Sequence, residues 1–464
     1  YLLDEEKEFI EPARIKSLIK KYCDFMPIDV LLEGECINKK NPPWRKNPSE
    51  LKDEDYIELY KYLYPYQGEP LLWIHLNTDF PYNIQGILYF PKLSGRADWE
   101  KGEIKLYCNQ VFVSDSIKEI VPRYLLPLRG VIDSTDIPLN VSRSALQTDR
   151  KVRSISSFIS KKIANKLKDL LKNNPDFYAE IWDSISAFVK IGVMEDEKFS
   201  DLAQNSIIFE TKLGSDLVKE EEIENKFLIK FNDKFFTTLE NYSNRNNKND
   251  DNKIIYCTDE ISQSNALNLW LSNNREVIKA DPLIDAQFIP WLESQNEKYK
   301  FQRVDSEIND DLEKDSPEIV DKDGKSNTDN IKEIITKALN NEKVTVKVQS
   351  LKNKNAPPAL ILLPEQMRRI NDMGAYMEQK IPGLPEYHVL LVNKDHPLIN
   401  GLIKFTDKKI ILNEKDSDES SLTGRIANHI YAMAKLTVGG LDQKQIVDLQ
   451  LNNAELLTEL LNSN

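Results

Sequence analysis

The sequence has few of the residues that build metal sites, disulfide frameworks or membrane spans. Its four cysteines (Cys23, Cys36, Cys108 and Cys257) stand singly, without a Cys-x-x-Cys pair. This spacing supports neither a zinc site nor a disulfide framework, and it fits a reducing compartment such as the cytoplasm. The four histidines are also unclustered, so we predict no metal site. No run approaches the ~20 apolar residues that are needed to cross a bilayer.

Motifs for a self-contained catalytic site are missing as well. There is no phosphate-binding loop, because Gly324-Lys-Ser326 lacks the upstream glycine, and there is no Gly-x-Gly-x-x-Gly or Gly-x-Ser-x-Gly turn. The net charge disfavours polyanionic partners, since 75 acidic and 62 basic residues give a net charge of −13. Without a net positive field, the chain is predicted to bind neither nucleic acid nor an anionic membrane.

What the sequence does contain is enough apolar material for a large folded protein. A length of 464 residues, 40% of them hydrophobic, predicts about three domains. The chain begins at Tyr1 and not at a methionine, so we expect a piece of a longer protein whose missing part carries the active site. Residues 305–326, rich in Asp, Glu, Ser and Lys, form the predicted linker.

Apolar periodicity predicts helices and strands mixed along the whole chain, as in sheets covered by helices. The predicted strands are 28–32, 70–76, 82–90, 103–113, 226–230, 253–257, 276–279, 343–350, 358–362 and 387–392. The predicted helices are 11–21, 51–63, 117–126, 146–171, 176–190, 197–206, 263–273, 329–340, 366–378, 397–403, 419–437 and 442–461. A loop is predicted at 130–142. A second loop is predicted at 241–252, because this segment has six asparagines and no apolar core residue. The clearest helix is 146–171, whose apolar side is opposed by lysines and arginines.

The first candidate site is the segment that opens this long helix. Arg143 lies where the N–H groups of a helix start favour an anion, so its guanidinium could bind phosphate oxygens of a nucleotide held in a separate pocket. Asn140 and Gln147, a turn or less away, could hold the arginine or the phosphate. The alternative is an ordinary helix capped by Ser142, with Arg143 in a surface ion pair.

The second candidate is an apolar stripe on the predicted helix at 366–378. It holds Met367, Ile370, Met373 and Met377, at steps of three and four residues. Because methionine is flexible, such a stripe favours a surface that accepts many apolar partners. The alternative, which is the commoner use of such a stripe, is a face buried in the core.

The third candidate is the pair of C-terminal helices, which are joined by Gly439-Gly440. Each carries an apolar stripe that either packs internally or is buried in a symmetric four-helix contact between two chains. We predict a dimer interface, formed by Leu422, Ile426, Ile430, Met433, Leu436, Leu456 and Leu460.

These three features, in this order, resemble the ninety-kilodalton heat-shock chaperone family, and the bacterial high-temperature protein G branch is the most similar. The resemblance runs from about Tyr1 to the end of the chain and is looser in the C-terminal third. It rests on the following motifs: Pro43-Trp-Arg-Lys-Asn-Pro-Ser49, Ile104-Lys-Leu-Tyr-Cys-Asn-Gln-Val-Phe-Val113, Val121-Pro-Arg-Tyr-Leu125, Leu128-Arg-Gly-Val-Ile-Asp-Ser134, Ile137-Pro-Leu-Asn-Val-Ser-Arg-Ser-Ala-Leu-Gln147, Ile254-Ile-Tyr-Cys-Thr-Asp259 and Ala280-Asp-Pro-Leu-Ile-Asp285.

The resemblance implies an α+β fold in two parts. The first is a layered αβα middle domain over 1–304, in which a large part (1–150) and a small part (207–304) are joined by a helical connector (151–206). The second is a mixed α/β C-terminal dimerisation domain over 305–464. It also implies that the family's N-terminal ATPase domain, which binds ATP and Mg²⁺, is missing from this chain.

For function, the resemblance implies an ATP-dependent chaperone that clamps partly folded client proteins as a homodimer and works with co-chaperones in the cytoplasm. Arg143 matches the arginine that reaches the γ-phosphate of ATP, and Asn140 and Gln147 match its neighbours. This chain alone is expected to hydrolyse ATP negligibly. The client surface is assigned to Trp99, Trp291, Met367, Ile370, Met373 and Met377.

Two departures from the family pattern limit what the resemblance carries over. Ser144 follows Arg143 where the family usually has glutamate, and the loop after Pro91 keeps Trp99 but loses other aromatic residues. Two alternatives therefore stay open. One is a dimeric scaffold without an ATPase cycle, and the other is a fragment of a related DNA-repair or topoisomerase-type ATPase, which the negative charge disfavours.

Overall fold

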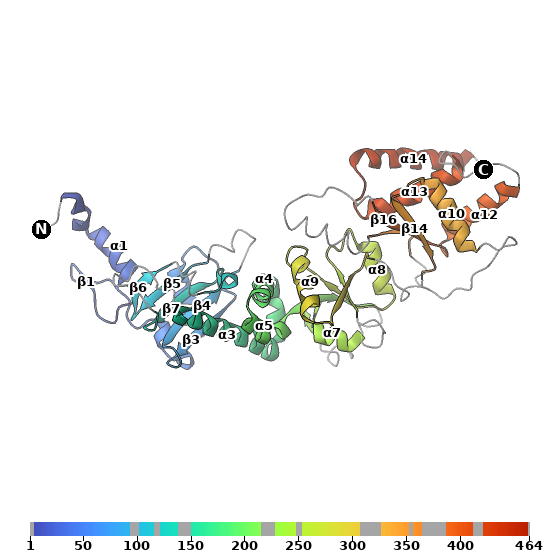
Figure 1. The fold of residues 1–464 in the computed structure, drawn as a ribbon. Helices are drawn as coiled ribbons and strands as arrows, with labels where there is room; N and C mark the ends of the chain where they lie inside the picture. The colour runs from blue at the N-terminus through green and yellow to red at the C-terminus, as the bar shows by residue number, and fades with distance from the viewer. Residues whose placement is uncertain are drawn as a thin grey trace. The chain divides into compact units, whose positions relative to one another are not determined.

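The computed structural model describes residues 4–92, 102–115, 121–137, 150–214, 228–246, 253–306, 326–351, 356–363, 387–411 and 421–462. The chain divides into two compact units, Tyr1–Ile207 and Ile208–Asn464. Each combines helices with a mixed sheet or sheets, so the predicted α+β class is confirmed (Figure 1). The predicted boundary between residues 304 and 305 lies inside the second unit and stays a prediction.

The first unit is built on a five-stranded sheet with the order β3-β4-β7-β5-β6. Neighbouring strands are antiparallel except β5 and β7, which are parallel. Helix α2 (Asp53–Leu63) packs its tyrosines with Trp44 on one face of this sheet, in a single aromatic core. The strands are β3 (Leu72–Thr78), β4 (Ile84–Phe90), β5 (Ile104–Cys108), β6 (Val111–Ser114) and β7 (Arg129–Ser134).

Short elements complete the N-terminal part of this unit. Pro12 occupies the first turn of α1, where its missing N–H has no helical partner to lose. The elements are η1 (Asp4–Ile10), α1 (Pro12–Tyr22), β1 (Leu31–Leu32), β2 (Glu35–Cys36), η2 (Pro43–Arg45), η3 (Pro48–Glu50) and η5 (Arg123–Leu125). The last is a single 3₁₀ turn in the described part of the predicted helix 117–126.

Strand β7 corrects the prediction of a loop over 130–142. Its residues alternate little in polarity and include Gly130, Asp133 and Ser134, which are typical of turns. Yet β7 lies in the middle of the sheet, hydrogen-bonded to β4 on one side and to β5 on the other. A central strand is buried on both faces and at both edges, so its tertiary environment overrides the local propensities.

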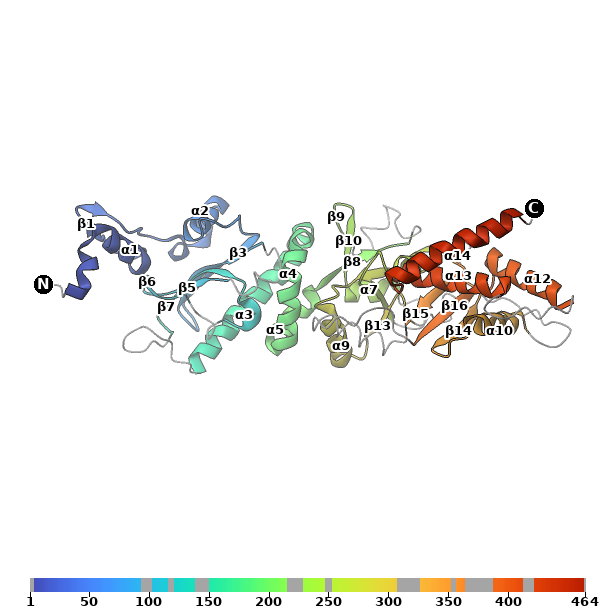
Figure 2. The ribbon, with the colours of Figure 1, turned by 90° about the horizontal axis from the view of Figure 1, so that it is seen from above.

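Helices follow the sheet in the described part of the first unit (Figure 2). The predicted long helix is confirmed as α3 (Arg150–Asn173), with Val152, Ile159 and Ile163 fully buried. Asn174 caps the start of α4 (Pro175–Glu195) and Asp196 caps α5 (Glu197–Ala203), which ends in η6 (Gln204–Ser206).

The second unit begins with a six-stranded sheet whose order is β13-β11-β12-β8-β10-β9. Strands β8 and β10 escaped prediction because they are short and mix apolar with polar residues, although both lie inside the sheet. The strands are β8 (Ile208–Lys212), β9 (Ile229–Phe231), β10 (Lys234–Thr238), β11 (Lys253–Cys257), β12 (Val277–Lys279) and β13 (Lys300–Arg303). Helices α8 (Ser264–Ser272) and α9 (Asp285–Gln295) accompany it.

Helix α7 (Leu239–Asn246) corrects the prediction of a solvated loop over 241–252. Tyr242 is only 2% exposed, so the asparagine-rich segment does contribute a core side chain. The asparagines disfavour a helix locally, but packing against the sheet compensates for that weak propensity. Residues 247–252 lie outside the described part of the chain.

The C-terminal part of the second unit has its own three-stranded sheet, with the order β14-β16-β15. Strands β14 (Val344–Gln349) and β16 (His388–Asn393) are parallel, and β15 (Ala359–Leu362) is antiparallel to β16. One apolar core joins this sheet to the helices α10 (Asn327–Leu339), α12 (Pro397–Ile411) and α13 (Leu422–Thr437). The last helix is α14 (Gln443–Asn462). The predicted helix at 366–378 lies outside the described residues.

A second apolar core connects the two sheets of this unit. Trp270 and Leu267 of α8 pack in the same cluster as Leu360 of β15 and Leu391 of β16. Burial in this cluster raises the pKa of the Cys257 thiol to about 11. The six-stranded sheet and the three-stranded C-terminal sheet therefore share buried apolar surface, which stabilises both.

We predict that replacing Gly130 by alanine strongly destabilises the first unit. Gly130 has φ of +136°, and an added Cβ would lie 2.0 Å from the carbonyl oxygen of Ile87. We expect the free energy of unfolding to fall by at least about 2 kcal/mol in urea titrations followed by circular dichroism. Gly68→Ala is the matched control, because no heavy atom lies within 4 Å of its added Cβ. Equal stability of the two variants would contradict this account.

Candidate functional site

The segment with the predicted phosphate-binding residues Asn140, Arg143 and Gln147 lies outside the described residues. What the structure describes is the two ends that hold this segment, which are residues 133–137 at the end of β7 and the start of α3 at Arg150. The segment therefore connects the central strand of the first unit with its longest helix.

The β7 end is fixed by three hydrogen bonds to the β3–β4 hairpin and within itself. Ser134 Oγ donates to the carbonyl of Asn83 at 2.7 Å, and the amide N–H of Asn83 donates to Asp136 Oδ2 at 2.7 Å. The amide of Asp136 in turn donates to Ser134 Oγ at 3.2 Å. Two short polar side chains thus determine where the chain leaves the sheet towards Arg143.

Asp133 adds a second constraint one residue earlier. Its buried carboxylate accepts hydrogen bonds from Trp44 Nε1 at 3.4 Å and from the amide of Gln110 at 3.3 Å. Arg45 Nε lies 3.8 Å from the same carboxylate. Trp44 and Gln110 belong to two of the motifs used for the family resemblance, but sequence spacing alone could not pair them with Asp133.

Of the predicted client-binding residues, only Trp291 lies in the described part of the chain. It is half-buried on α9, with its ring stacked on Phe288 at a centroid distance of 5.8 Å. Trp99, Met367, Ile370, Met373 and Met377 lie outside the described residues. The predicted client surface therefore stays a prediction.

The predicted dimer residues on α13 and α14 differ in how far their side chains are exposed. Ile430 is 2% exposed and belongs to the C-terminal core, Leu422 and Ile426 are half-buried, and Leu456 is buried. Met433 and Leu436 remain 44% and 40% exposed, and the side chain of Leu460 is not described. The surface open to a second chain is therefore narrower than the predicted stripe on α13.

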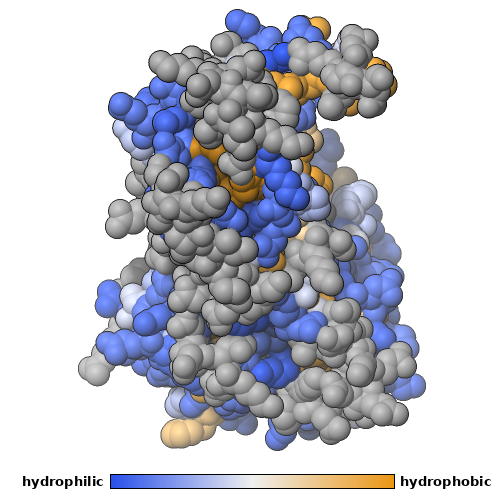
Figure 3. Space-filling view, turned by 90° about the vertical axis from the view of Figure 1, so that its right-hand side faces the viewer, coloured by the Kyte–Doolittle hydropathy of each residue, from blue (hydrophilic) through white to orange (hydrophobic). Residues whose placement is uncertain are grey.

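Helix α14 carries further exposed apolar side chains beside Leu456. Leu451, Leu457 and Leu461 are 59%, 53% and 78% exposed, and Val447 is 49% exposed. Figure 3, a view from the right-hand side of Figure 1, shows hydrophobic residues gathered in small patches on a mostly hydrophilic surface. Arg425 on α13 pairs with Glu455 on α14 at 3.4 Å and joins the two helices.

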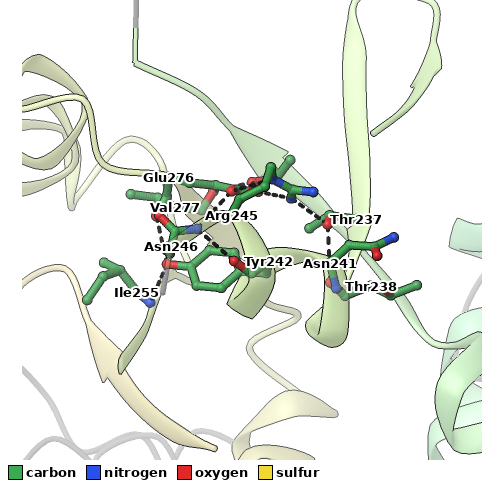
Figure 4. A network of polar contacts seen from close by, with 10 residues as sticks. Thr237, Thr238, Asn241, Tyr242, Arg245, Asn246, Ile255, Glu276 and Val277 are labelled. Atoms are coloured by element: carbon green, nitrogen blue, oxygen red, sulfur yellow. Dashed lines mark hydrogen bonds and ion pairs between the residues drawn. The ribbon is translucent and has the colours of Figure 1, made fainter. Parts of the chain in front are cut away.

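A polar network that the sequence did not reveal holds α7 on its sheet (Figure 4). The guanidinium of Arg245 donates to both carboxylate oxygens of Glu276, at 2.6 and 3.1 Å, and to Thr237 Oγ1 at 2.6 Å. Glu276 is 1% exposed and also accepts from Asn246 Nδ2 and Thr211 Oγ1. A buried charge with this many partners is a structural element of the fold.

A pocket of about 280 Å³ lies in the first unit, between α1, the end of α2 and the β5–β6 hairpin. Asp24 lines it, accepts a hydrogen bond from the Tyr62 hydroxyl at 2.8 Å, and has its pKa raised by burial. Three lysines and three carboxylates share the lining, so their charges balance. The lining residues are Lys20, Lys21, Asp24, Phe25, Tyr62, Leu63, Glu103, Lys105, Tyr107, Phe112 and Asp115.

Within the described ranges, no three His, Cys, Asp or Glu side chains group in a way that could hold a metal ion. The helices of this part of the chain include none that is long and apolar enough to span a bilayer.

A family model and individual relatives both match this chain, and both point to the same family. The family model described as Hsp90 protein matches residues 30–447. Chaperone protein HtpG of Bacteroides fragilis (strain 638R) is 37% identical over 435 residues, which cover 88% of this chain and 61% of the relative. Chaperone protein HtpG of Porphyromonas gingivalis (strain ATCC 33277) is 36% identical over 444 residues, covering 90% and 61%. That of Treponema denticola is 28% identical, covering 99% and 71%.

The chain thus spans about three-fifths of the length of the first two of these curated relatives.

We predict that the Arg245–Glu276 pair is strongly coupled. Arg245→Met leaves a buried carboxylate without its cation and should lower the free energy of unfolding by about 3–5 kcal/mol. Adding Glu276→Gln should recover part of this loss, because a neutral amide is less costly to bury than a charge. Urea unfolding of the single and double variants measures this coupling. Arg14→Met is the control, since its ion pair with Glu8 is exposed and is expected to contribute less than about 1 kcal/mol.

Proposed function

The chain belongs to the Hsp90 protein family, and on this basis we propose that it forms part of an ATP-dependent chaperone that clamps partly folded proteins as a dimer. The single observation that carries this proposal is the similarity to HtpG chaperones along about nine-tenths of the chain. A chaperone of this family assists protein folding, including under stress. The single, scattered cysteines support a place in the reducing cytoplasm.

We further propose that Arg143 acts on ATP that a separate domain binds together with Mg²⁺. In this proposal the guanidinium of Arg143 approaches the γ-phosphate and stabilises the charge that spreads over its oxygens during transfer to water. Asn140 and Gln147 orient the arginine or contact the same phosphate. Support comes from the β7 end of the segment, since the bonds of Ser134 and Asp136 to Asn83 limit where the chain can leave the sheet.

The client surface is proposed to include Trp99, Trp291 and the apolar stripe Met367, Ile370, Met373 and Met377. Large aromatic and flexible sulfur-containing side chains suit a site that binds many different unfolded segments. Trp291 is partly exposed on α9, and the exposed part of its side chain is available to such segments.

The dimer is proposed to form through α13 and α14. Exposed apolar side chains on both helices, among them Met433, Leu436 and Leu457, support this assignment. Two copies of such a helix pair would bury them in a four-helix contact. Because Ile430 already belongs to the core of its own subunit, α14 is expected to contribute more to the interface than α13.

We predict that Arg143→Ala reduces ATP turnover in the full-length protein without weakening nucleotide binding. Loss of a transition-state contact should lower kcat by about 10²-fold or more while changing the Kd for ATP less than about threefold. Steady-state hydrolysis and a fluorescent-nucleotide titration give the two values. Arg153→Ala is the control, because Arg153 is exposed on α3.

Equal loss of affinity and turnover would assign Arg143 to nucleotide binding instead. The 464 residues alone are expected to hydrolyse ATP negligibly, so measurable turnover from the purified chain would contradict the proposal.

We also predict that Leu457→Glu dissociates the dimer. The leucine is 53% exposed, so the fold should tolerate glutamate, whereas a charge buried between two chains should weaken their association about tenfold or more. Sedimentation velocity over a concentration series measures the change. Asn452→Glu adds the same charge to an exposed position of α14 and should leave the dimer intact. Dissociation by both variants, or by neither, would refute this interface.

A further inference from the structure

The long helix α3 carries a charge opposite to that of the protein. Its 24 residues include eight lysines and arginines and one acidic residue, Asp169, whereas the whole chain has a net charge of −13. Neither the phosphate-binding role proposed for Arg143 nor the dimer accounts for this concentration of positive charge.

The charges are ordered on the solvent side of the helix. At 3.6 residues per turn, Lys161, Lys168 and Lys172 fall within about 40° of one another. They lie opposite the buried residues Val152 and Ile163. We call these three lysines the α3 stripe; all three are exposed, and it extends about 16 Å along the helix. Lys162 and Lys166, also exposed, both lie to one side of it, about 100° and 140° around the helix from Lys161.

In the described part of the chain the α3 stripe is not neutralised by ion pairs, although Asp169 lies three residues before Lys172 on the adjoining side of the helix. Among the described residues, no carboxylate forms an ion pair with Lys161, Lys168 or Lys172, although ion pairs occur at many other lysines of the chain. Lys168 and Lys172 are also i,i+4 neighbours of like charge, which disfavours the helix. The helix therefore keeps a repulsive arrangement that an external anion would relieve.

The stripe is separate from the proposed phosphate site. The helix begins at Arg150 and rises about 1.5 Å per residue, so Lys161 lies about 16 Å and Lys172 about 33 Å along its axis. A lysine side chain cannot cover such a distance to a phosphate near Arg143. The stripe therefore needs a different ligand.

We propose that the α3 stripe is a docking surface for an acidic segment of a partner polypeptide. A short segment of Asp or Glu residues can pair with three lysines over about 16 Å without extending further. A longer polyanion such as nucleic acid would continue from the stripe onto a protein surface of net negative charge, which repels it. The proposal does not depend on ATP binding or on dimerisation.

The test uses the 464-residue chain and a fluorescein-labelled peptide of alternating Glu and Ser, about ten residues long, which covers the stripe when extended. Fluorescence anisotropy gives its Kd over a series of salt concentrations. The test variant is Lys161→Glu/Lys168→Glu/Lys172→Glu. The matched control, Lys46→Glu/Lys332→Glu/Lys444→Glu, changes the net charge equally at exposed lysines outside α3.

We expect the wild type to bind the peptide with an affinity that falls as salt rises. The test variant should bind about tenfold more weakly or worse, and the control within about twofold of the wild type. Circular dichroism verifies that both variants are folded.

Three results would overturn the proposal. They are no binding by the wild type, equal weakening by the two variants, and tighter stripe-dependent binding of an oligothymidine of equal charge than of the peptide. The last would identify single-stranded nucleic acid as the ligand.

Discussion

The close approach of two backbones at Gly86 and Gly130 determines the position of the central strand of the first unit. An added Cβ at Gly86 would lie 2.2 Å from the carbonyl oxygen of Val131, so neither strand can carry a side chain there. The contact brings β7 between β4 and β5, with Asp133 against Trp44 and Ser134 against Asn83. The exit of the chain towards Arg143 thus depends on two positions that have no side chain at all.

In the second unit, a buried polar network and an apolar cluster hold the helices on the six-stranded sheet. Around α7, a charged pair is buried and every partner atom has a directional role, so the network selects one arrangement of helix and sheet. Around α8, Trp270 and its apolar neighbours supply non-directional burial instead. The six-stranded sheet is therefore held by directional polar contacts at α7 and by apolar burial at α8.

The sequence predicted elements with strong periodicity and failed where the environment outweighed local preference. Helix α3 followed from apolar residues such as Ile159 and Ile163 at helical spacing, and the family followed from motifs such as Ile137–Gln147. Strand β7 and helix α7 were missed because glycine, aspartate and asparagine disfavour these structures in isolation. The pairing of Arg245 with Glu276 spans 31 positions, which no local pattern could indicate.

The shared core of the second unit has a consequence for how such proteins evolve. Trp270 and Leu267 contact a cluster to which Leu360 and Leu391 also belong, although about 90 to 120 positions separate them in the chain. A gene recombination with its crossover near residue 305 would join halves of that cluster from different ancestors. Such chimaeras would inherit mismatched volumes in one interior, whereas a crossover at residue 208 would keep the cluster intact.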